Sequence, residues 1–504
     1  MTSTTSTLLP TTSTTSTFFT AFQHSWRLIV IAIFFSLINW IESDLFGAFV
    51  RSTIHCNNST NTTIIIYPPN SGNWSGSTFC HSKKIVLQQA TEIAGEMVAV
   101  NNILGICATL VVGSYIDTFG RKPLMLLTFL GFFLCGGLLF IGGILGYGSS
   151  RSILFIALGV TKVLGTFPVA TQAMVADMTE RDEKVRGFTF MWLSMGGGLG
   201  TIIGFSAGFF VLRLCLTNYQ NVWLVFTIAS GLVGIIAYCL LTETLKEVKP
   251  AANEMMIDHA TAAVYGSATE GEYNQVDKEE KKDKEDQEED QEDDATSGPA
   301  ALVRGCRLIY RDTFLLSFLG VSFVANIGLV GAISIVTPFL IGKGKGWVYS
   351  QATASLVGVF LPGMSFISYA FSGAFLIPWL GTKGVNGLGL VTVGIGFSTI
   401  GFMAPSSSVC FWVGWCIAGL GLGMLIPTMT AIISVRIKNR DQGKVLSLIS
   451  VLLGLAASVA GLVWTNYLYN SEAKGMNAGT PFLISAMCMF SSLVLFGMSW
   501  WKFY

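Results

Sequence analysis

The chain alternates between long apolar stretches and short polar segments. Apolar runs of about twenty residues recur twelve times, and a helix of that length crosses the roughly 30 Å hydrocarbon core of a bilayer. Six predicted spans precede a long polar segment and six follow it, at residues 27–50, 93–115, 124–147, 152–176, 188–211 and 222–241, then 313–337, 353–378, 385–403, 409–433, 445–468 and 481–500. This pattern predicts an all-α polytopic membrane protein with twelve transmembrane helices in two pseudo-symmetric six-helix bundles, a layout typical of transporters.

Polar segments divide the chain into four parts. The Thr/Ser-rich residues 1–26 are expected to form a disordered cytosolic tail, and residues 27–245 an N-terminal six-helix bundle. Residues 246–312 are expected to form a disordered cytosolic linker, because 14 of the 30 acidic residues lie in 270–294 and leave it too charged to bury a core. A C-terminal six-helix bundle is expected over 313–504.

Composition argues against a water-soluble enzyme. Of the 504 residues, 51% are hydrophobic and only 12% are charged, whereas soluble domains carry about 25% charged residues. The sequence has no H-E-x-x-H motif, no phosphate-binding glycine loop and no histidine in a predicted span that could activate a nucleophile. We therefore expect no enzymatic activity, no cofactor and no metal.

Basic residues in the short loops predict the orientation. With both termini in the cytosol, 17 Lys and Arg residues fall on the cytosolic side and 8 fall outside, as the positive-inside rule favours. The excess positive charge outside the linker thus orients helices, and no nucleic-acid partner is expected. The oligomeric state is left open by the sequence.

The loop after the first predicted span carries the marks of an external segment. Four N-x-S/T acceptors for glycosylation cluster there, at Asn57, Asn58, Asn61 and Asn73. Cys56 and Cys80 flank the same loop and are the only cysteines in predicted external segments, so a Cys56–Cys80 disulfide is expected. We favour the plasma membrane over the lysosomal membrane, whose lumen would equally accept a glycosylated loop.

A motif with the pattern G-x-x-x-D-x-x-G-R-K joins the second and third predicted spans. Its residues are Gly113, Asp117, Gly120, Arg121 and Lys122. The glycines allow close helix approach, Asp117 can accept hydrogen bonds from basic groups or a helix N-terminus, and the two cations favour the cytosolic side. The motif suits a latch that breaks and forms again as a gate opens; the alternative is a generic turn with orienting charges.

The motif resembles the signature loop of the major facilitator superfamily, and the span pattern agrees. Finer features resemble the family of the proton-coupled folate transporter and the thymic stromal cotransporter. They are Val175-Ala-Asp177 with Arg186 nine residues later, Thr242 to Glu247, Asp441 to Val445, Asn466 to Tyr469 and Pro481-Phe-Leu. Where the folate carrier of that family has a proton-coupling glutamate in span five, this chain has Ser194, and the carrier's span-ten arginine falls near Thr430.

A few ionisable and polar side chains lie within the predicted spans. Lys162 lies about midway through span four, and Glu42 and Asp44 lie in span one. Because an embedded charge needs a partner or a water-filled cavity, we expect Lys162 to face a cavity and to pair with Glu42 or Asp44, or to attract an anionic group; a purely structural ion pair is the alternative. Asn326 and Thr430 are further candidates for the cavity wall.

These observations favour a secondary active transporter of a small organic solute that works by alternating access in the membrane. The sequence leaves open whether the solute is anionic and folate-like or of another kind. It also leaves open whether transport is symport with protons through Glu42, Asp44 or Lys162. The alternatives are a facilitator without coupling, and a receptor or scaffold that does not transport.

Overall fold

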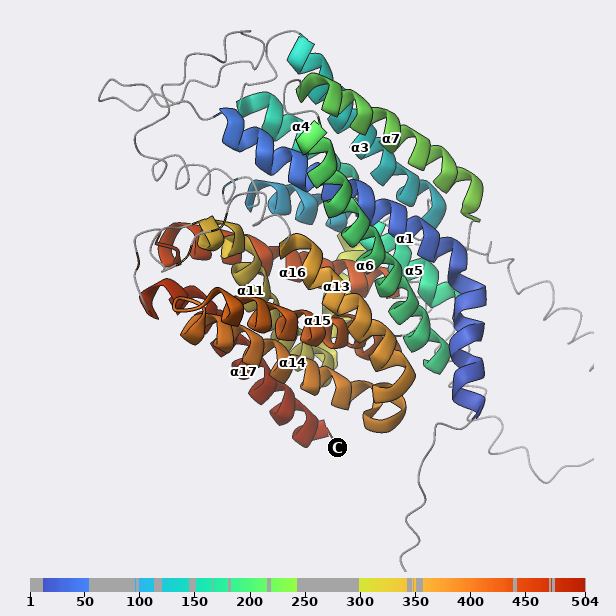
Figure 1. The fold of residues 1–504 in the computed structure, drawn as a ribbon. Helices are drawn as coiled ribbons and strands as arrows, with labels where there is room; N and C mark the ends of the chain where they lie inside the picture. The colour runs from blue at the N-terminus through green and yellow to red at the C-terminus, as the bar shows by residue number, and fades with distance from the viewer. Residues whose placement is uncertain are drawn as a thin grey trace, which may run out of the picture.

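The computed structural model describes residues 12–53, 96, 99–112, 120–144, 151–165, 167–179, 183–214, 219–242, 299–341, 347, 349, 357–437, 442–470, 473 and 476–503. Over these residues all regular elements are helices. Figure 1 shows the helices of the N-terminal half, coloured blue to green, gathered beside those of the C-terminal half, coloured yellow to red. The chain therefore folds into two adjacent helical halves.

The N-terminal half begins with one long helix that continues into the first span. Its helices are α1 (Thr12–Thr53), Ala99–Val112, α3 (Arg121–Ile144), α4 (Arg151–Leu164), α5 (Phe167–Met178), α6 (Glu183–Leu214) and α7 (Tyr219–Leu240). The fourth predicted span is thus divided into α4 and α5. The break lies at Gly165, directly after the turn that carries Lys162.

The C-terminal half contains two short π-helical turns within its spans. Its elements are α10 (Pro299–Arg311), α11 (Thr313–Ile341), α13 (Val357–Phe371), η1 (Ser372–Leu376), α14 (Ile377–Met403), α15 (Ser408–Arg436), α16 (Gln442–Val463), η3 (Trp464–Leu468) and α17 (Met476–Phe503). Between the two spans of Val357–Met403 the backbone turns at Gly381, whose φ of 69° favours glycine.

The described helices confirm the twelve-span architecture. Ten helical segments are long and apolar enough to cross a bilayer. One of these, Val357–Met403, is 47 residues long and holds two spans separated at Gly381, and the shorter apolar helix Ala99–Val112 supplies another. The protein is therefore an all-α, multi-pass membrane protein.

Each half encloses its own apolar core. In the N-terminal half Phe129 of α3 and Phe167 of α5 are buried, with ring centroids 6.3 Å apart. In the C-terminal half Phe411 and Trp415 of α15 stack at 5.8 Å, beside the fully buried Phe397 of α14. Because lipid chains are as apolar as these side chains, close packing between helices is what holds each bundle together.

Helix extends into two segments for which the sequence predicts disorder. α1 begins at Thr12, within the expected tail, and Ala21 of α1 is fully buried against Phe188 and Met191 of α6. α10 occupies part of the expected linker, and Ile309 of α10 packs into the C-terminal core. In both places a few apolar side chains reach a neighbouring helix, a tertiary contact that local composition does not reveal.

Candidate functional site

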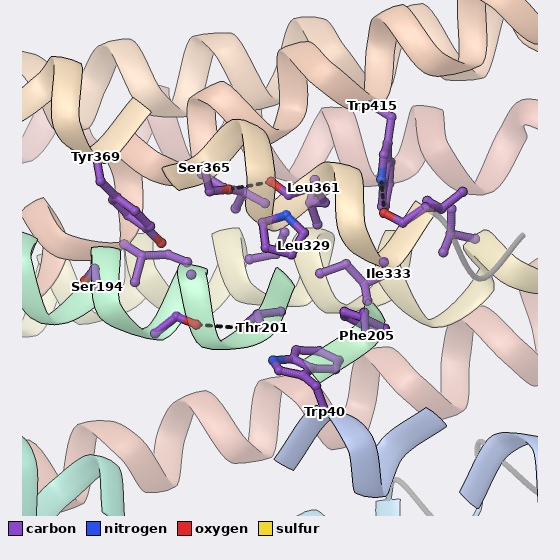
Figure 2. A pocket seen from close by; sticks show the side chains of 18 of the residues that line it. Trp40, Ser194, Thr201, Phe205, Leu329, Ile333, Leu361, Ser365, Tyr369 and Trp415 are labelled. Atoms are coloured by element: carbon purple, nitrogen blue, oxygen red, sulfur yellow. Dashed lines mark hydrogen bonds between the residues drawn. The ribbon is translucent and has the colours of Figure 1, made fainter. Parts of the chain in front are cut away.

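A cavity lies between the two halves of the molecule. Its volume is about 540 Å³, within the range of roughly 300 to 1,000 Å³ typical of small-molecule sites. The N-terminal half contributes residues of α1 and α6 to its wall, and the C-terminal half contributes residues of α11, α13 and α15 (Figure 2). A solute in this cavity would therefore contact both bundles at once.

The N-terminal wall combines an aromatic pair with small polar side chains. The rings of Trp40 and Phe205 lie 4.6 Å apart between centroids, at an interplanar angle of 31°. Along α6, Ser194, Gly197 and Thr201 face the same space, because residues three or four apart share one face of a helix. The Thr201 hydroxyl donates to the backbone carbonyl of Gly197 at 2.8 Å. This hydroxyl is therefore already occupied as a donor, as is common for threonine in membrane helices.

The C-terminal wall places Tyr369 opposite α6. Tyr369 is only 6% exposed, and its ring lies 3.5 Å from the position that a Cβ on Gly198 would occupy. Figure 2 shows the Tyr369 hydroxyl directed away from its own helix and toward α6. On the same wall Ser365 donates to the carbonyl of Gly419, and the indole of Trp415 donates to that of Val357, at 2.9 and 3.2 Å. These two donors link neighbouring helices, which leaves Tyr369 and Thr337 as hydroxyl groups of this wall that have no hydrogen bond to another described residue.

A second cavity of about 230 Å³ adjoins the first, since Leu329 and Ile426 line both. It too lies between the halves, because Gln172 of α5 faces residues of α11, α15 and α16. The sequence-predicted cavity residues Asn326 and Thr430 line this smaller space. The Asn326 amide donates to the backbone carbonyl of Leu453 at 2.7 Å, and the Thr430 hydroxyl to that of Ile426 at 3.3 Å.

The embedded charges of the N-terminal half form a cluster inside that bundle. Glu42 of α1 is 5% exposed, and the thiol of Cys135 on α3 donates to its carboxyl oxygen Oε1 at 3.3 Å. Lys162 of α4 acts on Glu42 as an opposite charge, whereas the hydroxyl of the adjacent Thr161 donates to the backbone carbonyl of Leu158 at 2.8 Å. Neither Glu42 nor Lys162 is among the described residues that line the two cavities. The side chain of Asp44, the other predicted partner, lies outside the described residues.

Within the G-x-x-x-D-x-x-G-R-K motif, Arg121 forms an ion pair with Asp177, near the end of span four. Gly120 has a φ of 85°, which favours glycine, and places Arg121 at the start of α3. Arg121 binds Asp177 of α5 through two contacts, Nε to Oδ2 at 2.9 Å and Nη2 to Oδ1 at 3.4 Å. Lys122 lies over the Tyr238 ring, 4.5 Å from its centroid. The ion pair and its one hydrogen bond, from Nη2 to Oδ1, make Arg121 a charge-assisted link between α3 and α5.

Arg186 joins the two halves directly. Its side chain is 7% exposed, and it donates to the carbonyl of Thr179 at 3.3 Å and to the carbonyl of Ser434 on α15 at 3.2 Å. The sequence singled out Arg186 only as part of a family resemblance and did not predict this bridge. Its position beside Ser434 depends on the packing of two segments 248 residues apart, which no local pattern reports.

Several predicted site residues lie outside the described part of the chain. They are Gly113 and Asp117 of the motif, the four glycosylation acceptors Asn57, Asn58, Asn61 and Asn73, and the two cysteines Cys56 and Cys80. Sequence reasoning also missed Trp40, Tyr369 and Phe205. The sequence does show each of them as a bulky aromatic residue within a predicted span. Aromatic residues are equally common on helix faces that contact lipid, so this feature alone does not indicate a cavity.

Comparison with known proteins indicates a family and a fold. The sequence matches the family model of the Major Facilitator Superfamily over residues 84–461. Among curated proteins it is similar to the class E tetracycline resistance protein of Escherichia coli, with 22% identity over 391 residues that cover 76% of this chain and 80% of that protein. The sequence match therefore extends over most of both halves.

Solved structures of similar fold cover nearly the whole chain. The human organic anion transporter MFSD10 (TETRAN) matches with a TM-score of 0.60 and 14% identity, over 94% of this chain and 99% of that one. The proton:xylose symporter XylE, bound to 6-bromo-6-deoxy-D-glucose, matches with a TM-score of 0.65 and 13% identity, over 96% and 95%. At these identities the likeness concerns the fold alone.

Proposed function

The chain belongs to the major facilitator superfamily, and from this premise we propose that it is a secondary transporter that moves a small organic solute by alternating access. The observation that carries the proposal is the cavity of about 540 Å³ between the bundles, whose wall is divided between them. A rocking movement of one bundle against the other would expose such a cavity to one side of the membrane at a time.

Two contacts of α6, one near its start and one further along it, are proposed to supply the two closures that this cycle needs. Near its start Arg186 donates to the carbonyl of Ser434 in the other bundle. Phe205 lies 19 residues further on, about 28 Å along the helix at 1.5 Å per residue, and it packs so closely on Gly358 that an added Cβ there would lie 2.5 Å from the ring. We propose that opening on one side breaks the Arg186 contact and that opening on the other side separates Phe205 from Gly358.

The Arg121–Asp177 ion pair is proposed to act as the latch of the first closure. It links α3 to α5 within the N-terminal bundle, next to the segment that carries Thr179 and Arg186. A partly buried ion pair of this kind, with one hydrogen bond from Nη2 to Oδ1, stiffens the end of span four, so that Arg186 is held in position for Ser434. Gly113, Asp117, Gly120 and Lys122 complete the motif in this proposal.

Glu42 and Lys162 are proposed as the coupling site. A carboxyl group buried beside a thiol donor and an opposite charge can be stable in two protonation states, which is what coupling to a proton requires. Lys162 lies in the last turn of α4, directly before the break in span four, so a change in its charge environment can alter the angle between α4 and α5. Asp44 is retained as a second carboxyl group of this site. Attraction of an anionic solute by Lys162 is the alternative role.

Uptake into proteoliposomes tests the proposal. The purified chain is reconstituted and offered folates, other organic anions and neutral solutes at acidic and neutral outside pH, with the Asp177→Asn variant in parallel. We expect saturable uptake that rises at acidic pH, and slower uptake of every solute in the variant, because the latch does not contact the solute. If the variant lost uptake of only one solute, this would contradict the proposal that the Arg121–Asp177 ion pair acts as a latch.

The outcome also separates the alternatives. Uptake that does not respond to pH would identify a facilitator without coupling, and failure of the whole panel in reconstituted, correctly folded protein would favour a receptor or scaffold. Single-cysteine variants at each end of the cavity can be labelled with impermeant thiol reagents. The labelling would show whether the cavity opens alternately to the two sides of the membrane, even before a solute is known.

Finer assignments from the sequence are part of the proposal. We propose that the chain is related, within the superfamily, to the proton-coupled folate transporter family. We also propose both termini in the cytosol, residence in the plasma membrane, glycosylation in the first loop and a Cys56–Cys80 disulfide, supported by the positions of the sequons, cysteines and basic loops. Digestion with a glycosidase and a mass shift on reduction test the loop assignments.

A further inference from the structure

The central cavity is lined entirely by uncharged side chains among the described residues. Its polar members are hydroxyl and indole groups, and the remainder are aliphatic or aromatic side chains and glycines. The adjoining smaller cavity is also uncharged over the residues described, with Gln172 and Asn326 as its amides. A charged solute entering these cavities would lose hydration without gaining an opposite charge, which strongly disfavours its binding.

Four polar groups on the wall of the larger cavity have hydrogen-bonding capacity that the rest of the described chain does not use. Tyr369, Ser194 and Thr337 each offer a hydroxyl, and Trp40 offers an indole N–H, with no hydrogen bond to another described residue. Tyr369 is 94% buried, from its exposed fraction of 6%, and its hydroxyl points toward α6 (Figure 2). A hydroxyl on the cavity wall that has no partner in the described chain can donate to a solute atom, and that hydrogen bond would contribute to binding.

The aromatic groups indicate what shape of solute fits. Trp40 and Phe205 form one continuous apolar wall, and Trp415 lies on the wall contributed by the other half. The indole of Trp415 is held rigid by its bond to the Val357 carbonyl. Flat rings pack well on such surfaces, because stacked and tilted aromatic pairs are favoured at centroid separations of about 4.5 to 7 Å.

We infer that the cavity binds an electrically neutral solute that contains a flat ring and at least one hydrogen-bond acceptor, and that the Tyr369 hydroxyl is its main polar contact. The inference rests on the proposed transport function and narrows its substrate class. It favours a neutral solute over the anionic one that Lys162 would attract, because Lys162 is not among the described residues of the wall. The embedded charges then serve coupling and leave solute recognition to uncharged groups.

The test measures equilibrium binding, which needs no transport cycle. The full chain in lipid nanodiscs is titrated with two series of compounds, each with one ring system and a neutral, anionic or cationic side chain of similar size: indole-3-acetamide, indole-3-acetate and tryptamine, and the corresponding 1-naphthyl amide, acetate and ethylamine. Binding is followed as a concentration-dependent rise in the unfolding temperature. We expect the neutral amide of each series to bind most tightly.

Variants of the wall identify the contact. Tyr369→Phe keeps the ring and removes the hydroxyl, and we expect it to weaken binding of the amides about three- to tenfold, the effect of one hydrogen bond. Tyr467→Phe is the matched control, because Tyr467 is 82% exposed and lies outside the wall. This variant should bind the amides with the affinity of the wild type. Trp40→Phe provides a second test, with a similar loss. The unfolding temperature of each variant without solute shows that it folds.

Three results would overturn the inference. They are tighter binding of the acetate or of the amine in both series, absence of binding by both amides, and unchanged affinity in both the Tyr369→Phe and Trp40→Phe variants. Each of these leaves the proposed transport function standing, because thiol accessibility at the two ends of the cavity reports alternating access separately. Conversely, binding of the neutral amides without any alternation of access would contradict the proposed transport function and leave the inferred solute class standing.

Discussion

At the scale of single residues, the N-terminal bundle keeps a carboxyl group in an interior where water is scarce. Glu42 is accommodated by the Cys135 thiol at 3.3 Å and by the opposite charge of Lys162. The sequence identified Glu42 and Lys162 by their cost in a membrane, but it did not reveal Cys135, since a cysteine in a span has the ordinary appearance of a small apolar residue. The Cys135–Glu42 contact, with Lys162 near enough for its charge to act on Glu42, exists only because residues of α1, α3 and α4 come together inside the bundle.

Replacement of Lys162 tests this site. We expect Lys162→Ala to reduce proton-dependent uptake at least about tenfold and to lower the free energy of unfolding by about 1 to 3 kcal/mol, because Glu42 loses its opposite charge in a buried site. Uptake in proteoliposomes and thermal unfolding measure the two effects. The double variant Glu42→Gln/Lys162→Met removes both charges and should recover the stability but not the coupling. Normal pH-dependent uptake by Lys162→Ala would rule out the coupling role.

At the scale of elements, α6 is built to lie directly against α1. Glycines at every fourth position of α6 meet the backbone of α1: a Cβ on Gly196 would lie 2.9 Å from the Ile29 carbonyl oxygen, and one on Gly204 would lie 2.7 Å from that of Leu37. Gly200 between them meets the Ile33 carbonyl even more closely. Small residues at this spacing let two membrane helices pack closely, and the tertiary structure identifies α1 as the partner of α6.

A pair of alanine substitutions on α6 tests this contact. We expect Gly200→Ala to lower the free energy of unfolding by about 1 to 3 kcal/mol, because its Cβ would overlap the Ile33 carbonyl and push the helices apart. Gly187→Ala on the same helix is the control: an added Cβ there has nothing within 4 Å, so it should raise stability by about 0.4 to 1 kcal/mol. Denaturation of both purified variants measures the difference. Equal effects of the two would show that helix propensity, and not packing on α1, governs α6.

At the scale of the whole molecule, the boundary between the halves combines a polar contact with apolar packing. The bond from Arg186 to the Ser434 carbonyl is such a polar contact, and the cavities lie along the same boundary. Around that boundary the contacts are apolar side chains on glycine, such as Ile106 near Gly454 and Phe205 on Gly358. Apolar contacts of this kind can separate without leaving buried polar groups unpaired.

Thiol labelling tests the role of Arg186. In a Ser434→Cys background the new thiol replaces a side chain with 0% exposure and leaves the backbone carbonyl in place. We expect Arg186→Ala to raise its labelling rate by an impermeant maleimide roughly tenfold, the factor that a loss of about 1.4 kcal/mol in closure gives. Arg307→Ala, at an exposed position of α10, should leave the rate unchanged. An unchanged rate in Arg186→Ala would place the closure elsewhere.

The sequence by itself determined the fold class, the twelve spans and the superfamily motif, because hydrophobic length and loop charge act locally and need no knowledge of neighbours. It also marked Glu42, Lys162, Asn326, Thr430 and the Arg121 motif as polar groups that a membrane would otherwise exclude. Only the tertiary structure decided that Asn326 and Thr430 line a smaller cavity, that Trp40 and Tyr369 face the larger one, and that Arg186 reaches Ser434. These facts depend on which face of each helix turns toward which neighbour, and that choice is made by packing across distances of up to 248 residues in the chain.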